Sequence, residues 1–486
     1  MADDDKKLGL FALVGVVISA MIGGGVYNLP QNMAQNASAG AILIAWIITG
    51  IGIWFVANTF RILASARPED TAGIYTYGEQ GFGKFVGFLS AWGYWICNCF
   101  ANIGYAVLLM DSLNYFFPGY FTGGNNIWSI LGGSIVLWIM YFVILSGVKG
   151  ATSINIIGTI GKLVPLGIFL FVLLIFFKLS LFFTDFWGLK AFPQLHDADL
   201  GSLFTQVKST MLVTLWVFIG IEGAVVVSDR AKSQKLVSKA TLLGFLTCLF
   251  IYIGLSLLPI GTVPQGEIST MSPPSTGAVL GRLVGKWGDV LMNLGVMISV
   301  LSSWLVWTIM LAELPFMASK SGTFPKEFSK ENKNGSASFS LLMSTFIMQT
   351  IMFIVYFSNN AWNLMIDITG VMVLPCYIIC TGYLWKIAYK DDNYPKDIFA
   401  SLKTAMITGF LGTVYGAWLV YAAGLNYMLI AAIIYSLGIP VFIRARKENA
   451  PSESVFTKTE KILAICLVLI GCYGVVYVVN NINTLL

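Results

Sequence analysis

The stretch that decides the fold is residues 18–30, ISAMIGGGVYNLP, in which Gly23, Gly24 and Gly25 interrupt the first apolar segment. Each glycine weakens a helix by about 1 kcal/mol relative to alanine. In lipid, a helix break is tolerated only where its backbone groups face protein or a water-filled cavity. A break near the midplane frees the N-terminus of a half-helix, which attracts anions such as a carboxylate. The alternative is that the glycines only allow helices to pack closely.

Composition places the chain among multi-pass membrane proteins. Hydrophobic residues make up 57% of the 486 residues and charged residues only 11%, with a mean hydropathy of +0.78. The single histidine, His196, lies in a polar connection, and the seven cysteines show no metal-binding spacing. We therefore expect no metal site, no cofactor and no catalytic residue.

Apolar windows predict thirteen spans in the cell membrane. With the N-terminus in the cytoplasm, 24 of the 29 lysines and arginines lie on the cytoplasmic side, which agrees with the positive-inside rule. The odd number of spans then places the C-terminus outside. The predicted spans are residues 9–30, 40–62, 85–115, 127–146, 155–178, 205–228, 238–261, 287–317, 337–357, 361–386, 402–422, 424–443 and 460–480.

A second interruption lies in the sixth span, at residues 215–224, LWVFIGIEGA. Two glycines there flank Glu222, and a carboxylate inside a membrane is costly unless it faces a cavity or a partner. The alternative for Glu222 is an ion pair or hydrogen bond that holds helices together. Two breaks five spans apart are typical of transporters built from inverted repeats.

These observations predict an all-α polytopic membrane protein with a five-plus-five inverted-repeat transporter fold, in which spans 1 and 6 are broken. We expect a transporter domain of twelve spans over residues 1–444. Its repeats should cover about residues 8–180 and 205–390. Residues 445–486 then add one further span of unassigned role.

Four stretches carry a resemblance to a known family: MIGGGVYNLP at 21–30, YWICNCFANI at 94–103, LWVFIGIE at 215–222, and Trp307-Thr308 followed by GTFP at 322–325. On these residues the chain resembles the amino acid–polyamine–organocation superfamily, in its basic amino acid/polyamine antiporter branch. It most resembles the arginine/ornithine exchangers. The resemblance implies sodium-independent exchange of a cationic amino acid for its metabolic product. The alternative is an amino acid/amine exchanger for histidine/histamine, lysine/cadaverine or agmatine/putrescine.

The resemblance also implies roles for residues of the two breaks. Backbone N–H groups at Gly23, Gly24 and Gly25 bind the substrate carboxylate, with Ile22 beside them. Many relatives carry a serine where this chain has Gly24, so only backbone donors remain there. In the second break, Trp216, Ile219 and Glu222 belong to the gate. The plain alternative for a tryptophan at this depth is packing.

The side chain of the substrate is assigned to other spans by the same resemblance. Trp307 stacks on the cationic group, a cation–π contact worth about 2 kcal/mol when it is desolvated. Trp304, three residues earlier, is the alternative for that role. Asn102 meets the distal end of the substrate, unless it only forms a hydrogen bond between helices. Asp367, Tyr377 and Asp111 are further candidates for side-chain recognition, with the alternative that the two aspartates lie at the membrane rim.

Lys162, within TIGKLVP at residues 159–165, has two interpretations. A lysine at this spacing in sodium-independent relatives places its ammonium where sodium-coupled relatives hold a cation, so the resemblance implies a cation-site substitute. The alternative is that the side chain extends to the cytoplasmic surface.

Other functional classes fit the sequence less well. A channel would show a repeated filter sequence, a membrane enzyme would show a nucleophile or metal motif, and a sensor would carry a soluble output domain. We therefore expect an exchanger whose partners are a basic amino acid or amine and the lipid bilayer, without nucleic acid. Whether two copies form a homodimer is left open.

Overall fold

The computed structural model describes residues 9–67, 74–147, 151–188, 200–221, 234–390, 394–395 and 398–481. Ten helices in these ranges are long and apolar enough to cross a membrane, and a bent pair at residues 13–34 makes up to eleven. The prediction of an all-α, multi-span membrane protein is therefore confirmed. The count of thirteen spans and the inverted repeat remain predictions.

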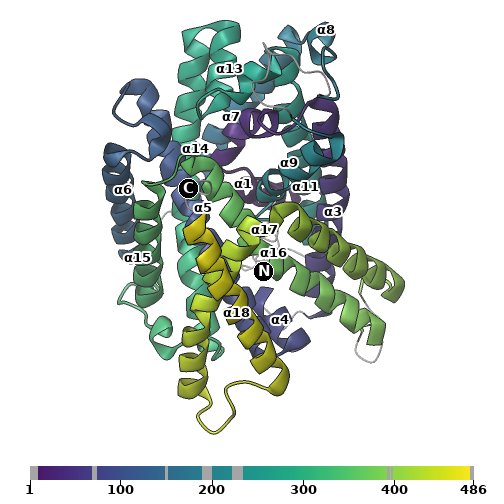
Figure 1. The fold of residues 1–486 in the computed structure, drawn as a ribbon, viewed down its shortest axis with the longest axis vertical. Coiled ribbons are helices and arrows are strands. Elements are labelled where there is room, and N and C mark those ends of the chain that lie inside the picture. Colours follow the sequence, from purple (N-terminus) through teal and green to yellow (C-terminus); the bar gives the residue numbers. More distant parts are fainter. Residues whose placement is uncertain are drawn as a thin grey trace, which may run out of the picture.

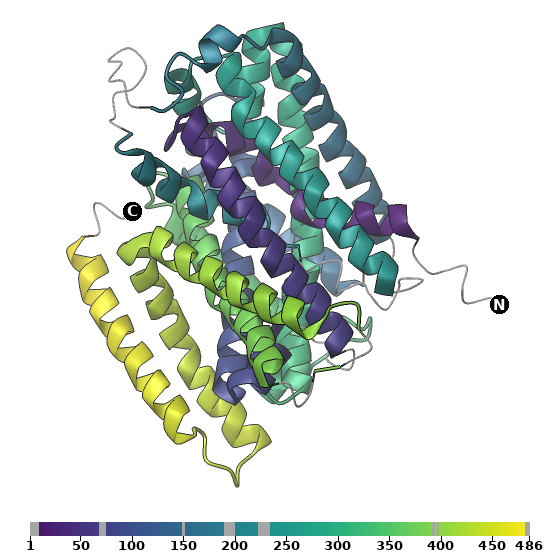
Figure 2. The ribbon, with the colours of Figure 1, turned by 90° about the vertical axis from the view of Figure 1, so that its right-hand side faces the viewer.

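Two helices explain most of the difference from thirteen. The helix α17 (Leu402–Asn449) has 48 residues and covers two predicted spans. A straight helix of that length would measure about 72 Å, more than twice the ~30 Å hydrocarbon thickness. Gly424 interrupts it with φ of 78°, at the predicted junction, and Figure 2 shows α17 as two rods. The helix α9 (Leu203–Trp216) is the first part of the predicted sixth span and is too short to cross alone.

Three long helices form the centre of the molecule (Figure 1). They are α5 (Lys84–Phe116), α14 (Lys286–Lys320) and α16 (Ala361–Lys390). The helix α5 packs against both of the others, and 89% of its apolar window is buried. Because protein surrounds α5 on nearly all sides, its polar residues are positioned to line an internal site.

Other helices surround this centre and leave apolar faces for lipid. Only 28% of α6 (Ile127–Leu145) and 17% of α18 (Lys458–Asn480) is buried in the corresponding windows. The remaining elements are α1 (Leu10–Met21), η2 (Gly24–Asn28), α2 (Leu29–Ala34), α3 (Ala39–Ala66), α4 (Ile74–Phe82), η3 (Thr122–Gly124), α7 (Ala151–Phe176), α8 (Leu179–Phe182), α11 (Gln234–Leu257), η5 (Pro259–Gly261), α12 (Gln265–Ser269), α13 (Ser275–Val284), η6 (Lys326–Ser329) and α15 (Ser338–Val355).

The last helix, α18, is tied to the centre by one carboxylate. Glu460 accepts a hydrogen bond from the backbone N–H of Thr457 (2.8 Å), which forms a capping box at the start of α18. Its other oxygen accepts from the N–H of Phe85 (2.9 Å), in the first turn of α5. The N-cap residue of α5 is Gly83, which has no side chain to serve as a cap. The helix α18 therefore supplies the cap that α5 lacks. The division of the chain at residue 444 remains a prediction, and α17 continues through that position to Asn449.

Candidate functional site

The first span is broken at the glycine run. The helix α1 ends at Met21, the backbone at Ile22 and Gly23 is extended, and the 3-10 helix η2 begins at Gly24. The two halves of the span meet at 54°. The break frees the last carbonyls of α1 and the first N–H groups of the second half in the middle of the protein.

A second break follows Trp216, where α9 ends. The chain continues in tight turns, with the N–H of Ile219 donating to the carbonyl of Trp216 (3.1 Å). Gly220 has φ of 103°, which side chains other than glycine rarely adopt. A Cβ at Gly220 would lie 2.9 Å from the carbonyl oxygen of Ala20, so the two breaks are in contact. Glu222 lies outside the described residues.

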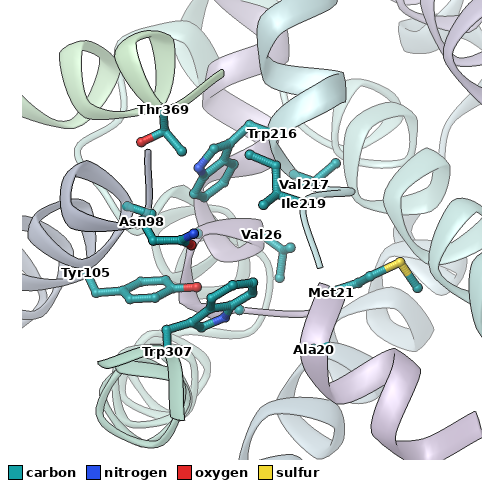
Figure 3. A pocket seen from close by; sticks show the side chains of 13 residues that line it. Ala20, Met21, Val26, Asn98, Tyr105, Trp216, Val217, Ile219, Trp307 and Thr369 are labelled. Atoms are coloured by element: carbon teal, nitrogen blue, oxygen red, sulfur yellow. The ribbon is translucent and has the colours of Figure 1, made fainter. Parts of the chain in front are cut away.

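A cavity lies between the breaks and the helices α5, α14 and α16 (Figure 3). Its empty space is about 380 Å³, counting the part that opens to solvent. Among the described residues, no charged side chain lines it. The lining residues are Ala20, Met21, Gly23, Gly25, Val26, Asn98, Ala101, Tyr105, Trp216, Val217, Ile219, Trp307 and Thr369.

Five of the predicted residues line this cavity: Gly23, Gly25, Trp216, Ile219 and Trp307. A Cβ at Gly25 would lie 1.7 Å from the indole ring of Trp216, so the tryptophan occupies the space that the glycine leaves. The structure thus brings together residues that are 284 positions apart in the sequence, from Gly23 to Trp307.

Gly24 differs from the other two glycines of the run. It is buried but does not line the cavity, and a Cβ there would lie 2.2 Å from Cγ2 of Val300 on α14. Close packing between helices, the alternative for the whole run, therefore describes Gly24. Gly23 and Gly25 face the cavity.

Three further predicted residues are buried but do not line the cavity, although each is close in sequence to a residue that does. They are Ile22, Asn102 and Trp304. Asn102 donates from its amide to the carbonyl oxygen of Asn98 (2.9 Å), one helical turn earlier. This hydrogen bond lies within α5, so it is not the contact between helices that was the alternative for Asn102, and its role toward the substrate stays a prediction.

Asn98, Thr369 and Tyr105 are cavity residues that the sequence did not assign to the site. The Asn98 amide donates to the carbonyl of Tyr94 (2.7 Å). Within the described residues, its Oδ1 and the hydroxyl of Thr369 are buried without a hydrogen-bond partner. The spacing of Asn98 and Asn102 by four residues was the available signal, because it puts both amides on one face of a helix.

Lys162 contacts both halves of the broken span. Its side chain is 2% exposed, and its Nζ donates to the carbonyl oxygen of Ser19 (2.8 Å), among the last carbonyls of α1. Its own carbonyl accepts from the hydroxyl of Tyr27 in η2 (2.8 Å). A positive charge at the C-terminus of a half-helix is favourable. This geometry does not match a side chain that extends to the cytoplasmic surface.

The remaining candidates lie away from the cavity. Asp111 accepts from the N–H of Gly123 (3.1 Å), in the connection after α5. Asp367 shares a hydrogen bond with Tyr427 of α17. Tyr377 is buried and packs edge-on against Phe60, with ring centroids 5.8 Å apart. None of these three side chains lines the described cavity.

Comparisons with known proteins identify the family. Residues 8–446 match the model of the family described as amino acid permease. The chain belongs to this family of the amino acid–polyamine–organocation superfamily, which consists of transporters and not of enzymes.

Individual relatives cover nearly the whole chain. A Clostridium perfringens protein provisionally named an amino-acid transporter is 70% identical over 98% of this chain and 99% of its own length. The arginine/agmatine antiporter of Chlamydia pneumoniae is 54% identical over 94% of this chain and 93% of its own length. That of Chlamydia caviae is 53% identical over 95% of each chain. This protein is therefore an amino acid transporter that crosses the membrane several times.

Proposed function

We propose that this protein exchanges a basic amino acid for an amine across the cell membrane, and that the pair is arginine and agmatine. The observation that carries the proposal is the identity of more than half of the aligned residues with proteins named arginine/agmatine antiporters. These relatives support arginine/ornithine exchange, the first expectation from the sequence, less well. The amino acid/amine alternative is supported by these relatives, although arginine/agmatine was not among the pairs named for it.

The chemistry of the cavity agrees with a substrate that carries a guanidinium group. The face of the Trp307 ring attracts a delocalised cation. The Oδ1 of Asn98 and the hydroxyl of Thr369 have no hydrogen-bond partner in the described part of the chain and can accept from the N–H donors of guanidinium. Both arginine and agmatine carry this group, so these residues suit either substrate, and no charged side chain of the described part of the chain lines the cavity.

The roles of the two breaks are part of the same proposal. The backbone at Gly23 and Gly25 binds the carboxylate of arginine. Trp216 covers the substrate with Ile219 beside it, and Glu222 belongs to the gate. Lys162 replaces a coupling cation, which makes exchange independent of sodium.

Exchange in proteoliposomes tests the proposal directly. Vesicles loaded with agmatine should take up labelled arginine, and replacement of external sodium by choline should leave the initial rate unchanged. Empty vesicles should take up little. Faster uptake into ornithine-loaded than into agmatine-loaded vesicles would favour the arginine/ornithine alternative and contradict the proposal.

A further inference from the structure

Tyr105 occupies the space next to the first break that a side chain at position 23 would otherwise fill. It lies on α5, lines the cavity and is 7% exposed. A Cβ at Gly23 would lie 2.6 Å from the Tyr105 hydroxyl oxygen. The backbone of Gly23 is extended, with φ of −92°, a conformation that any residue adopts. Glycine at position 23 therefore provides space for the Tyr105 hydroxyl and is not required by the backbone conformation.

The Tyr105 hydroxyl has no hydrogen-bond partner within the described part of the chain. It is not among the fully buried polar atoms that lack a partner, which agrees with its place on the cavity wall. Figure 3 shows the Tyr105 ring beside Trp307, with its hydroxyl directed into the cavity near the break. The hydroxyl is thus available to a molecule that enters the cavity.

The chemistry of the two proposed substrates limits what this hydroxyl can donate to. A tyrosine hydroxyl can accept from guanidinium or ammonium, which carry only donors, but a hydrogen bond of that kind would not distinguish arginine from agmatine. A carboxylate is the acceptor that arginine has and agmatine lacks. The glycine run itself carries no hydroxyl, so a tyrosine from another helix is the hydroxyl donor nearest to Gly23.

We infer that the Tyr105 hydroxyl donates a hydrogen bond to the carboxylate of an amino acid substrate, and that Tyr105 thereby distinguishes the amino acid from its decarboxylated amine. The inference rests on the proposed exchange of an amino acid for an amine. Gly23 and Tyr105 act as a matched pair, because the glycine leaves the room that the hydroxyl uses.

The test is the variant Tyr105→Phe in the full chain, with equilibrium binding of arginine and of agmatine measured on the purified protein. Loss of a hydrogen bond to a charged group should raise the Kd of arginine about tenfold. The Kd of agmatine should stay within about twofold. Arginine methyl ester, which lacks the carboxylate charge, should bind wild type and variant about equally.

The matched control is Tyr415→Phe, which removes a hydroxyl of similar burial (6% exposed) from α17, away from the cavity. It should leave both Kd values unchanged. An equal loss for arginine and agmatine in Tyr105→Phe would overturn the inference, since the hydroxyl would then act on a group that both share or on the break itself. No loss for either would overturn it as well.

Two further outcomes keep the inference separate from folding and from the proposed exchange. If Tyr105→Phe loses its cooperative thermal unfolding, Tyr105→Met provides the same comparison without a hydroxyl. If wild type binds neither arginine nor agmatine, the proposed substrate pair is wrong. The same comparison on the amino acid and amine that wild type does bind then decides the role of Tyr105.

Discussion

Replacing Lys162 by methionine keeps most of the side-chain length and removes the charge that joins α7 to the broken span. The variant leaves the Ser19 carbonyl without the donor that now lies 2.8 Å away, at a position where the lysine is 2% exposed. A hydrogen bond from a charged donor contributes about 1.5–3 kcal/mol. A middle value of about 2 kcal/mol corresponds to a factor of roughly 30 in a conformational equilibrium.

The assay is the initial rate of arginine uptake into agmatine-loaded proteoliposomes, at equal amounts of inserted protein and with choline in place of sodium. We expect Lys162→Met to be roughly 30-fold slower than wild type at low substrate, by the same conversion. Wild type should transport equally well in sodium and in choline.

The matched control is Lys320→Met, which removes an exposed lysine that pairs with Glu331 (3.0 Å). Exposed ion pairs contribute little, so this variant should behave as wild type. A rate for Lys162→Met within twofold of wild type would refute the reasoning, because the contact with Ser19 would then have no part in transport. A steep sodium dependence of wild type would refute the assignment as a cation substitute.

Four further variants test other parts of the protein. Gly25→Ala should abolish substrate binding while the protein still inserts, since its Cβ would lie 1.7 Å from the Trp216 ring; unchanged binding in a titration would contradict this. Trp307→Leu should weaken arginine binding about tenfold and Trp307→Phe less, whereas citrulline, which is neutral, should lose less than arginine; equal losses would indicate packing alone. Glu460→Gln should speed hydrogen exchange at Phe85 in the first turn of α5, measured by mass spectrometry, and unchanged exchange would show that the cap is dispensable.

The breaks and joints of the helices were predictable because they depend on local backbone chemistry. The glycine run placed the first break between Met21 and Gly24, and the predicted junction between two spans coincides with the kink at Gly424. At Gly424 the positive φ is a conformation that other residues rarely adopt, whereas the glycines of the run weaken the helix.

Which side chains of a helix face the cavity was less predictable, because this depends on neighbouring helices that are far away in sequence. Asn98 and Asn102 share one face of α5, but only Asn98 reaches the cavity. In the sequence Tyr105 has the pattern of an aromatic residue of the core. Only the structure shows that it lies beside Gly23, which is 82 positions away. For Lys162, the choice between two readings required the position of Ser19 on another helix.

The shared carboxylate of Glu460 has a consequence for how the protein is made. Phe85 and Glu460 are 375 residues apart. Ribosomes add roughly 5–20 residues per second, so about 20 to 75 seconds pass between the synthesis of one residue and the other. During that interval the start of α5 is without its cap. The cap of this central helix forms only after α18 has been made.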